Sequence, residues 1–330
     1  MDKRFAVIIF ILLSIIISGC LDDSKPPQPH LDESEVTITT KGGFGGGITS
    51  ISWNQNGSML ATSSFRSTIQ IWDTIAWGGI INITGHDGSV VMVAWNSDGS
   101  KLASISIDGT LRIWDTSTWQ ISHIISENDS FLLCLSWNPD GSKLAAANFA
   151  PGFTVRIWDT DTWEIIKDIK VDAVVESISW SPNGEEIALA VGRIVKIYNT
   201  MTWEKEMELT DNPNEVYSVS YSPDGTMFAL AINDINGTVK IMQTATWENI
   251  QSMLYYYGGG PENLAWSPDS SKLALWPNRT IVDIWNTSNW QIVQQLRGHT
   301  RRVYDLSWSP DGSKIATGAT TEIKIWNITS

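Results

Sequence analysis

The stretch VAWNSDGSKLASISIDGTLRIWDTSTW at residues 93–119 contains the unit from which this chain is built. Its three tryptophans, Trp95, Trp114 and Trp119, have counterparts along almost the whole sequence. Each indole buries roughly 150–250 Å² and needs a matching cavity, so a repeated spacing of tryptophans indicates a repeated structure. A period of forty-odd residues is typical of solenoids, propellers and arrays.

Seventeen of the eighteen tryptophans fall into three sets that recur in step. The first set has spacings of 42, 42, 43, 41, 45 and 42 residues, and its members are Trp53, Trp95, Trp137, Trp180, Tyr221, Trp266 and Trp308. The second set consists of Trp72, Trp114, Trp158, Tyr198, Met242, Trp285 and Trp326. The third set consists of Trp77, Trp119, Trp163, Trp203, Trp247 and Trp290. One structural unit is therefore copied seven times.

Each copy reads as a series of short strands. A large aliphatic residue and a small one precede the first-set aromatic, as Val93 and Ala94 precede Trp95, and this alternation predicts a strand with two different faces. A turn such as NSDGS follows, and then a second strand at 101–106, a third at 110–115 and a looser fourth. No segment has helical periodicity.

Four short antiparallel strands, repeated seven times, predict an all-β fold. A single four-stranded sheet cannot bury both faces, whereas seven sheets arranged radially can, and closure into a ring protects most edges. We therefore expect a seven-bladed β-propeller. The last copy ends at its third strand (322–327), so we expect the segment EVTITTK at 35–41 to pair with the last blade and close the ring.

These features resemble the WD-repeat family over about residues 36–330. The Trp-Asp dipeptide that names the family stands at 72–73, 114–115 and 158–159, and its Gly-His pair stands at 85–86 and 298–299. Periplasmic propellers with SPDG-type turns, such as TolB-like proteins, are an alternative relationship.

The resemblance implies a structural role for four residues of the second copy. They match the hydrogen-bonded tetrad of the family, and they are His86, Ser104, Asp108 and Trp114. The other copies depart from the tetrad, and arginine occupies its aspartate position in the first and sixth copies.

The first twenty residues have the architecture of an export signal. Lys3 and Arg4 precede an apolar run at 5–17 that is too short for a comfortable membrane span. The sequence ISGC at 17–20 resembles the lipobox of prokaryotic lipoproteins, which implies that Cys20 becomes the lipidated first residue of the mature chain. The alternative is an uncleaved membrane anchor. Both interpretations predict a cell-membrane protein on the extracytoplasmic face.

We expect three segments in this order: a lipoprotein-type signal peptide at 1–19, an acidic, Pro-rich spacer at 20–34 that begins with the lipidated cysteine, and the propeller at 35–330. The net charge of −14 argues against a nucleic acid partner, because such a surface repels phosphate backbones. With Cys20 lipidated, Cys134 is the one remaining cysteine, so no disulfide framework is expected, and we expect its thiol to be buried.

Motifs for catalysis or metal binding are missing from the sequence. It contains no HExxH, CxxC, Gly-x-Ser-x-Gly or phosphate-loop motif, and its four histidines are scattered. We therefore expect no catalytic step, no metal and no cofactor.

Candidate binding residues lie in the loops that differ between copies. In this topology, the loops from strand four to one and from strand two to three emerge on one rim, which we call the variable rim, and the SPDG and DTxTW turns lie on the other, the turn rim. Aromatic residues and arginine are enriched at binding hot spots, and arginines on one arc of an acidic chain create a positive patch. The candidates are Trp276, Arg279, Tyr256, Arg301, Arg302, Phe65 and Arg66.

Some of these aromatics have a structural alternative. Trp276, in the loop WPNRT, would then pack on its own loop, and the tyrosines at 255–257 would fill the gap between blades. A second, weaker binding candidate is FAPGF at 149–153.

The predicted function is that of a membrane-tethered, extracytoplasmic propeller whose variable rim binds a protein or peptide. The alternative is a propeller that binds a cell-surface glycan or small ligand on the same arc, with Trp276 and the tyrosines stacked on sugar rings. A divergent propeller enzyme is the least favoured interpretation, because fold alone does not imply function.

Overall fold

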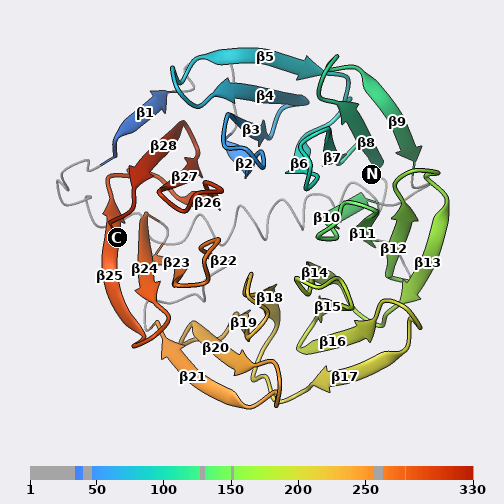
Figure 1. Ribbon diagram of the computed structural model, residues 1–330, viewed down its shortest axis with the longest axis vertical. Helices are drawn as coiled ribbons and strands as arrows, with labels where there is room; N and C mark the ends of the chain where they lie inside the picture. The colour runs from blue at the N-terminus through green and yellow to red at the C-terminus, as the bar shows by residue number, and fades with distance from the viewer. Residues whose placement is uncertain are drawn as a thin grey trace, which may run out of the picture. The chain divides into compact units, whose positions relative to one another are not determined.

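The computed structural model describes residues 34–39, 47–126, 131–149, 152–255, 263–278 and 280–329. Within these ranges the chain forms 28 strands and no helix, and the strands make seven four-stranded antiparallel sheets. The sheets surround a common axis as the blades of a propeller (Figure 1). The predicted seven-bladed β-propeller is confirmed. No helix that could cross a membrane is found in the described parts of the chain.

The strands of each blade follow one another from the axis outward (Figure 1). Blade 1 contains β2 (Ile48–Trp53), β3 (Met59–Ser64), β4 (Thr68–Asp73) and β5 (Gly79–Thr84). Blade 2 contains β6 (Val90–Trp95), β7 (Lys101–Ser106), β8 (Thr110–Asp115) and β9 (Ile121–Ser126). Blade 3 contains β10 (Phe131–Trp137), β11 (Lys143–Phe149), β12 (Thr154–Asp159) and β13 (Ile165–Lys170). Blade 4 contains β14 (Val175–Trp180), β15 (Glu186–Val191), β16 (Ile194–Asn199) and β17 (Lys205–Leu209).

The remaining blades complete the ring. Blade 5 contains β18 (Val216–Tyr221), β19 (Met227–Ile232), β20 (Thr238–Gln243) and β21 (Asn249–Leu254). Blade 6 contains β22 (Leu264–Trp266), β23 (Lys272–Asn278), β24 (Ile281–Asn286) and β25 (Gln291–Arg297). Blade 7 contains β26 (Val303–Trp308), β27 (Lys314–Ala319) and β28 (Glu322–Asn327), and its outermost strand is β1 (Val36–Thr39).

Hydrogen bonds place the two predicted turns of each blade on the same rim. In blade 2, the Thr116 hydroxyl donates to the backbone oxygen of Gly99 at 2.8 Å, which joins the turn after β8 to the turn after β6. The same bond recurs from Thr74, Thr160, Thr200, Thr244 and Thr287. The turn rim is therefore a repeated, internally bonded surface.

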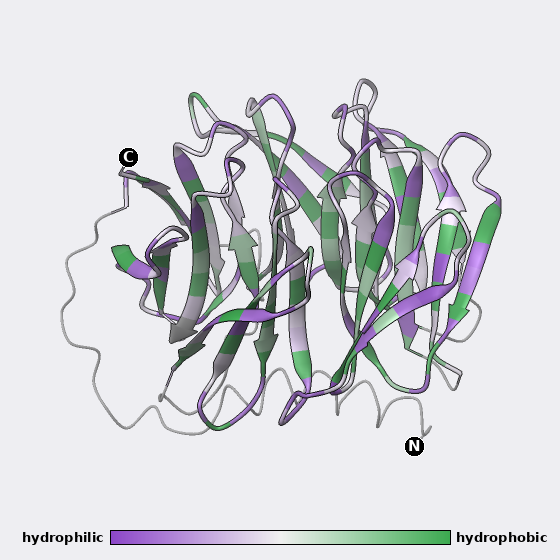
Figure 2. Ribbon diagram, turned by 60° about the horizontal axis from the view of Figure 1, so that its bottom comes forward, coloured by the Kyte–Doolittle hydropathy of each residue, from purple (hydrophilic) through white to green (hydrophobic). Residues whose placement is uncertain are grey.

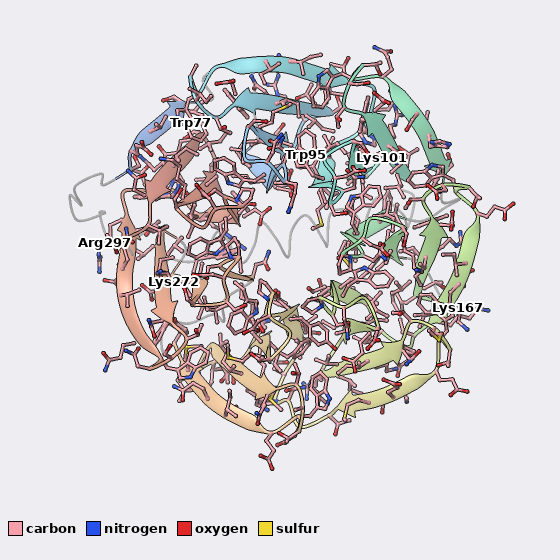
Figure 3. All side chains as sticks on the ribbon, viewed as in Figure 1. Trp77, Trp95, Lys101, Lys167, Lys272 and Arg297 are labelled. Atoms are coloured by element: carbon pink, nitrogen blue, oxygen red, sulfur yellow. The ribbon has the colours of Figure 1, made fainter. Side chains whose placement is uncertain are left out.

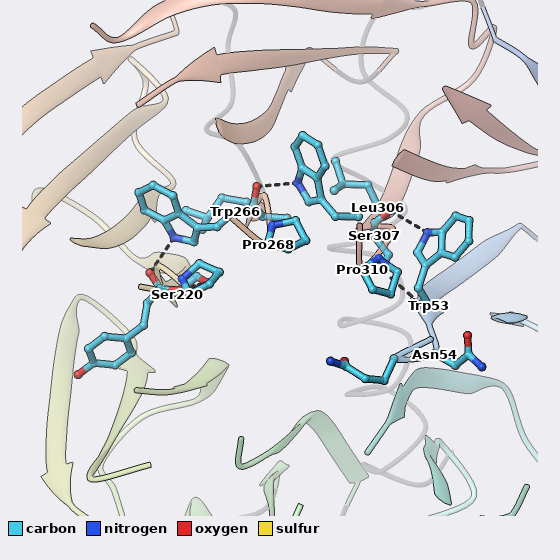
Figure 4. A pocket seen from close by; sticks show the side chains of 14 residues that line it. Trp53, Asn54, Ser220, Trp266, Pro268, Leu306, Ser307 and Pro310 are labelled. Atoms are coloured by element: carbon cyan, nitrogen blue, oxygen red, sulfur yellow. Dashed lines mark hydrogen bonds between the residues drawn. The ribbon is translucent and has the colours of Figure 1, made fainter. Parts of the chain in front are cut away.

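The first-set tryptophans join neighbouring blades. Each indole Nε1 donates to the backbone oxygen of the small residue just before the first-set position of the preceding blade, as Trp95 donates to Ser52 at 3.1 Å. The other five bonds, of 3.0–3.2 Å, run from Trp53 to Ser307, Trp137 to Ala94, Trp180 to Ser136, Trp266 to Ser220 and Trp308 to Ala265. We call these six bonds the indole ring. Figure 4 shows three of them.

Blades 4 and 5 meet without an indole bond, because Tyr221 occupies the first-set position there. Its hydroxyl donates to Glu186 Oε2 at 2.7 Å, and its backbone N–H donates to the Ser179 hydroxyl at 3.1 Å. This junction is therefore held by a different pair of hydrogen bonds across the same two blades.

The third-set tryptophans sit in the turns between strands three and four. All six have left-handed backbone conformations, with φ between 53° and 59°. In blade 2, Trp119 N–H donates to the Asp115 carbonyl at 2.7 Å, and the indole packs edge-on against Trp95 with ring centroids 5.8 Å apart. An L-residue rarely adopts this φ, so the ring packing and turn bonds must offset the local strain. Figure 3 labels the third-set Trp77 of blade 1 and the first-set Trp95 of blade 2.

The hydrophobic core lies between the blades. Ala61 and Ile71 of blade 1 pack in one cluster with Val93 and Leu102 of blade 2, and similar clusters fill the other junctions. Figure 2 shows hydrophobic residues concentrated along the strands. Each blade thus buries its faces against its two neighbours, as the repeated alternation predicts.

The predicted ring closure is also confirmed. β1 pairs antiparallel with β28, from Val36 opposite Ile325 to Thr39 opposite Glu322. The Lys324 side chain is only 2% exposed, and its ammonium donates to the Thr37 hydroxyl at 3.0 Å. Glu322 of the same strand lies 3.8 Å from this ammonium, and β1 adds a hydrogen-bond acceptor to it from the closing side.

Removal of β1 should destabilise the whole ring. We expect a chain that begins at Thr40 to unfold at a clearly lower temperature than one that begins at Ser34, because the edge of β28 loses its paired strand and the Lys324 ammonium loses its bond to Thr37. Scanning calorimetry on the two chains measures the difference, and equal midpoints would contradict this role of β1.

Candidate partner-binding site on the variable rim

The four tetrad residues of blade 2 are joined by hydrogen bonds. His86 contacts Asp108 through Nδ1 at 2.8 Å and Ser104 through Nε2 at 2.7 Å, and Trp114 Nε1 donates to the Ser104 hydroxyl at 2.8 Å. Burial lowers the pKa of His86, against the opposing effect of the Asp108 hydrogen bond. The network ties the entry loop of the blade to β7 and β8, so its role is structural.

Blade 7 has an equivalent network that the sequence reasoning missed. His299 contacts Glu322 at 2.8 Å and Thr317 at 2.6 Å, and Trp326 Nε1 donates to the Thr317 hydroxyl at 2.7 Å. Threonine and glutamate replace the serine and aspartate of blade 2. The Gly-His pair at 298–299 was the available signal.

The structure corrects the predicted position of Trp276. This residue lies within β23 rather than in a loop, and only 4% of it is exposed. Its indole packs between blades 6 and 7, in a cluster with Leu296 and Val303. The ring therefore has no face available for a ligand. Its Nε1 has no hydrogen-bond partner among the residues that the structure describes.

One of the three tyrosines predicted near blade 6 is described, and it is buried. Tyr255 is 6% exposed, and its hydroxyl accepts a hydrogen bond from Trp285 Nε1 at 2.5 Å. It replaces the serine and histidine that hold the second-set tryptophan in blade 2. Tyr255 therefore fits the alternative interpretation, in which a tyrosine fills the gap between blades.

The structure brings two of the predicted binding residues together at the junction of blades 7 and 1. The Arg302 guanidinium lies over the Tyr304 ring, 5.3 Å from its centroid. Phe65 meets the same ring edge-to-face, with centroids 5.9 Å apart. Arg66 and Arg301 are exposed beside these residues in sequence. We call Phe65, Arg302 and Tyr304 the rim cluster.

Sequence reasoning missed Tyr304, which is the central ring of the rim cluster. Its signal is positional: it stands four residues before the first-set Trp308, on the innermost strand of blade 7. The backbone of the partner loop is also fixed, because Ser89 Oγ donates to the Phe65 carbonyl at 2.5 Å. Both sides of the cluster are therefore held by blade-to-blade contacts.

Several of the other predicted site residues cannot be placed relative to this cluster. Arg279, Tyr256 and Cys20 lie outside the described residues. In the weaker candidate segment, Phe149 and Phe153 are half-buried and contact each other, with ring centroids 5.9 Å apart.

A hollow of about 440 Å³ opens on the turn rim (Figure 4). Its lining comes from the ends of innermost strands and the turns after them, including Trp53, Trp266 and Trp308 with Pro268 and Pro310. The three indole N–H groups are already bonded to backbone oxygens. These three N–H groups are therefore not free to bind a ligand in the hollow.

No group of three or more His, Cys, Asp or Glu in the described parts of the chain is placed to hold a metal ion. Cys134 is buried as expected, and burial raises the pKa of its thiol.

Comparisons with known families agree with this architecture. Residues 35–73, 79–115, 119–159 and 290–327 match the family described as WD domain, G-beta repeat. Residues 156–275 match the family described as eukaryotic translation initiation factor eIF2A. The chain is a seven-bladed β-propeller, and four of its stretches match WD40 repeats.

Similar proteins cover only part of the chain. It is 29% identical over 135 residues to Meiotic fizzy-related protein 2 of Schizosaccharomyces pombe, which covers 41% of this chain and 24% of that protein. It is 23% identical over 129 residues to WD repeat-containing protein VIP3 of Arabidopsis thaliana, with 36% and 40% covered. It is 26% identical over 122 residues to Polyadenylation factor subunit 2 of Candida albicans, with 36% and 22% covered. The chain spans less than half the length of each of these relatives.

The unpartnered indole of Trp276 leads to a stability prediction. Trp276→Phe should cost clearly less than Trp276→Ala, because the phenyl ring keeps part of the packing and the lost N–H has no acceptor in the described chain. Trp276→Ala should cost about 3–5 kcal/mol, because it leaves a cavity between blades 6 and 7. Urea denaturation measures both values.

Trp285→Phe is the matched control, because the Trp285 N–H donates to Tyr255. This control should lose more stability than Trp276→Phe. Equal losses for Trp276→Phe and Trp285→Phe would contradict the difference between the two indole N–H groups.

Proposed function

We propose that this chain is a protein-interaction scaffold that holds a partner segment on its variable rim. The observation that carries the proposal is the rim cluster, in which one ring is held between a guanidinium and a second ring. Aromatic and arginine side chains held in this way are typical anchors of protein interfaces, because little conformational entropy is lost when a partner binds. WD40 propellers commonly bind protein partners, which supports the same class of function.

The two rims differ in a way that favours the variable one. The turn rim repeats the same threonine-to-turn bond in six blades, as a scaffold surface does. The variable rim carries loops of unlike sequence on rigid strands, which is where binding residues usually lie. Its Arg301 and Arg302 lie in one short loop, so an acidic partner would gain most from this arc.

A glycan site built on Trp276 is not proposed. The indole is buried between blades, and Tyr255 is buried beside Trp285, so neither ring offers a face to a sugar.

We further propose that the scaffold is exported and held at a membrane through its N-terminus. The support is the sequence alone: a basic start, an apolar run at 5–17 and the lipobox-like ISGC ending at Cys20. A lipid on Cys20 followed by the spacer would place the propeller close to the bilayer on the extracytoplasmic face.

The rim cluster is tested by quantitative affinity purification from solubilised membranes. The double variant Arg302→Ala and Tyr304→Ala should lose at least tenfold of any stoichiometric partner, because it removes the central ring and its cation. The control carries Lys167→Ala and Arg297→Ala, two residues that project outward from β13 and β25 (Figure 3). Equal recovery of the partner by both proteins would contradict the proposed site.

The membrane anchor is tested separately. Cys20→Ser should leave the precursor unprocessed or release the protein from the membrane fraction, because the proposed thioether cannot form. Fractionation of cells that express both forms, with mass spectrometry of the mature N-terminus, measures this. An unmodified Cys20 in membrane-bound wild-type protein would contradict lipidation.

A further inference from the structure

Six of the seven innermost strands begin with a β-bulge next to the axis, and the described part of β22 has none. The pairing with the second strand skips one residue in the described blades with a full-length innermost strand, as between Leu132 and Cys134 in blade 3. The skipped residue is left out of the ladder, so its side chain is aimed differently from its neighbours. The skipped residues are Thr49, Val91, Leu133, Glu176, Tyr217 and Tyr304.

We call these six residues the axial belt. All six are half-buried or exposed, whereas the residue before each of them is buried. Because the bulges occupy the start of the innermost strands, the belt lies at the variable-rim end of the axis. Contacts between neighbouring blades flank the belt: Thr49 Oγ1 donates to the Val90 carbonyl at 2.7 Å, and Cys134 Sγ lies 3.6 Å from the Val175 carbonyl.

The side chains of the belt differ in polarity from blade to blade. In blades 2 and 3 it presents Val91 and Leu133, which are apolar and half-buried. In blade 4 the same position holds Glu176, whose side chain is exposed. The carboxylate is therefore the neighbour of an apolar arc that lies on the strands β6 and β10.

The surroundings of Glu176 disfavour its negative charge. The strands around the axis displace part of the water that would solvate the Glu176 carboxylate, and the charge of Glu215 adds to this effect, so the pKa is raised to about 7. Among the described residues, Glu215 is the one charged group that contributes to this shift, so no described cation offsets the carboxylate. A cation at this place would be stabilised by both glutamates.

We propose that the axial belt binds a lysine or arginine side chain of the partner segment, with its aliphatic stem against Val91 and Leu133 and its charged end at Glu176. The inference rests on the proposed function of the variable rim. Long basic side chains bury their methylene groups on apolar surface while the charged group stays at a polar one, which fits this pair of neighbouring surfaces. The segment would extend across the rim from the axis toward Arg302 and Tyr304.

Synthetic peptides test the proposal without a known partner. The probe is a fluorescein-labelled heptapeptide, Gly-Ser-Leu-Lys-Leu-Ser-Gly, and the matched peptide carries norleucine in place of lysine. Fluorescence anisotropy should show at least tenfold tighter binding of the lysine peptide, the scale of one charge-assisted hydrogen bond. Glu176→Gln should remove this difference, and the control Glu164→Gln, in an exposed turn of blade 3, should keep it.

Affinity should also depend on pH in a defined direction. A bound cation favours the ionised carboxylate, so the lysine peptide should bind more tightly as the pH rises from 6 to 8, through the pKa of about 7 of Glu176. The other titratable groups that face Glu176 in the described chain are Glu215 and Cys134, and burial raises the pKa of the thiol, which keeps it neutral in this range. Glu176→Gln should abolish the pH dependence, and Glu215→Gln should move its midpoint to lower pH.

Several results would overturn the proposal. The lysine and norleucine peptides could bind equally well, or the Glu176→Gln variant could bind the lysine peptide as tightly as the wild type does. The third such result is that no peptide binds at millimolar concentration. If the partner is still lost from the double variant of Arg302 and Tyr304, the proposed function stands and only the belt inference fails. If that variant retains the partner, the variable-rim function fails with it.

Discussion

The propeller depends on one interaction that recurs at six of its seven blade junctions: an indole N–H that donates to a backbone oxygen of the preceding blade. The bond satisfies a carbonyl on the inner edge of a sheet, where no further strand can pair with it. The acceptor residue is always serine or alanine. A larger side chain beside that oxygen would crowd the indole. The same bond therefore accounts for both the first-set tryptophans and the small residues before them.

Much of this architecture could be predicted from the sequence because it repeats. Seven copies of one pattern are seven observations of the same strand, turn and junction. A residue that recurs at the same position in most copies is therefore not a chance match. The exceptions were harder to predict. Trp276 stands off the lattice, and its neighbours Pro277 and Asn278 suggested a loop; the strand β23 instead runs through this segment. A residue that occurs once and outside the repeat has no periodicity, so its sequence position does not show whether its side chain is buried between blades or exposed for binding.

The candidate site was only partly predictable for the same reason. Phe65 and Arg302 were identified as unusual loop residues, but the ring between them, Tyr304, lies within a strand and occupies a repeat position. The axial belt was missed because its residues differ in type from blade to blade, and the β-bulge that exposes them leaves no mark on a single copy. Closure of the propeller ring brings these unlike residues together at one end of the axis, where a partner can contact them as one surface.

The most direct test of the indole ring replaces Trp95 by benzothienylalanine, which keeps the shape of the ring system and lacks the N–H. The same replacement at Trp276, whose Nε1 has no partner in the described chain, is the reference. Free energies of unfolding in urea should fall by about 1–3 kcal/mol at position 95, because the Ser52 carbonyl loses its donor, and should stay within about 0.5 kcal/mol at position 276. Equal effects at the two positions would contradict the account.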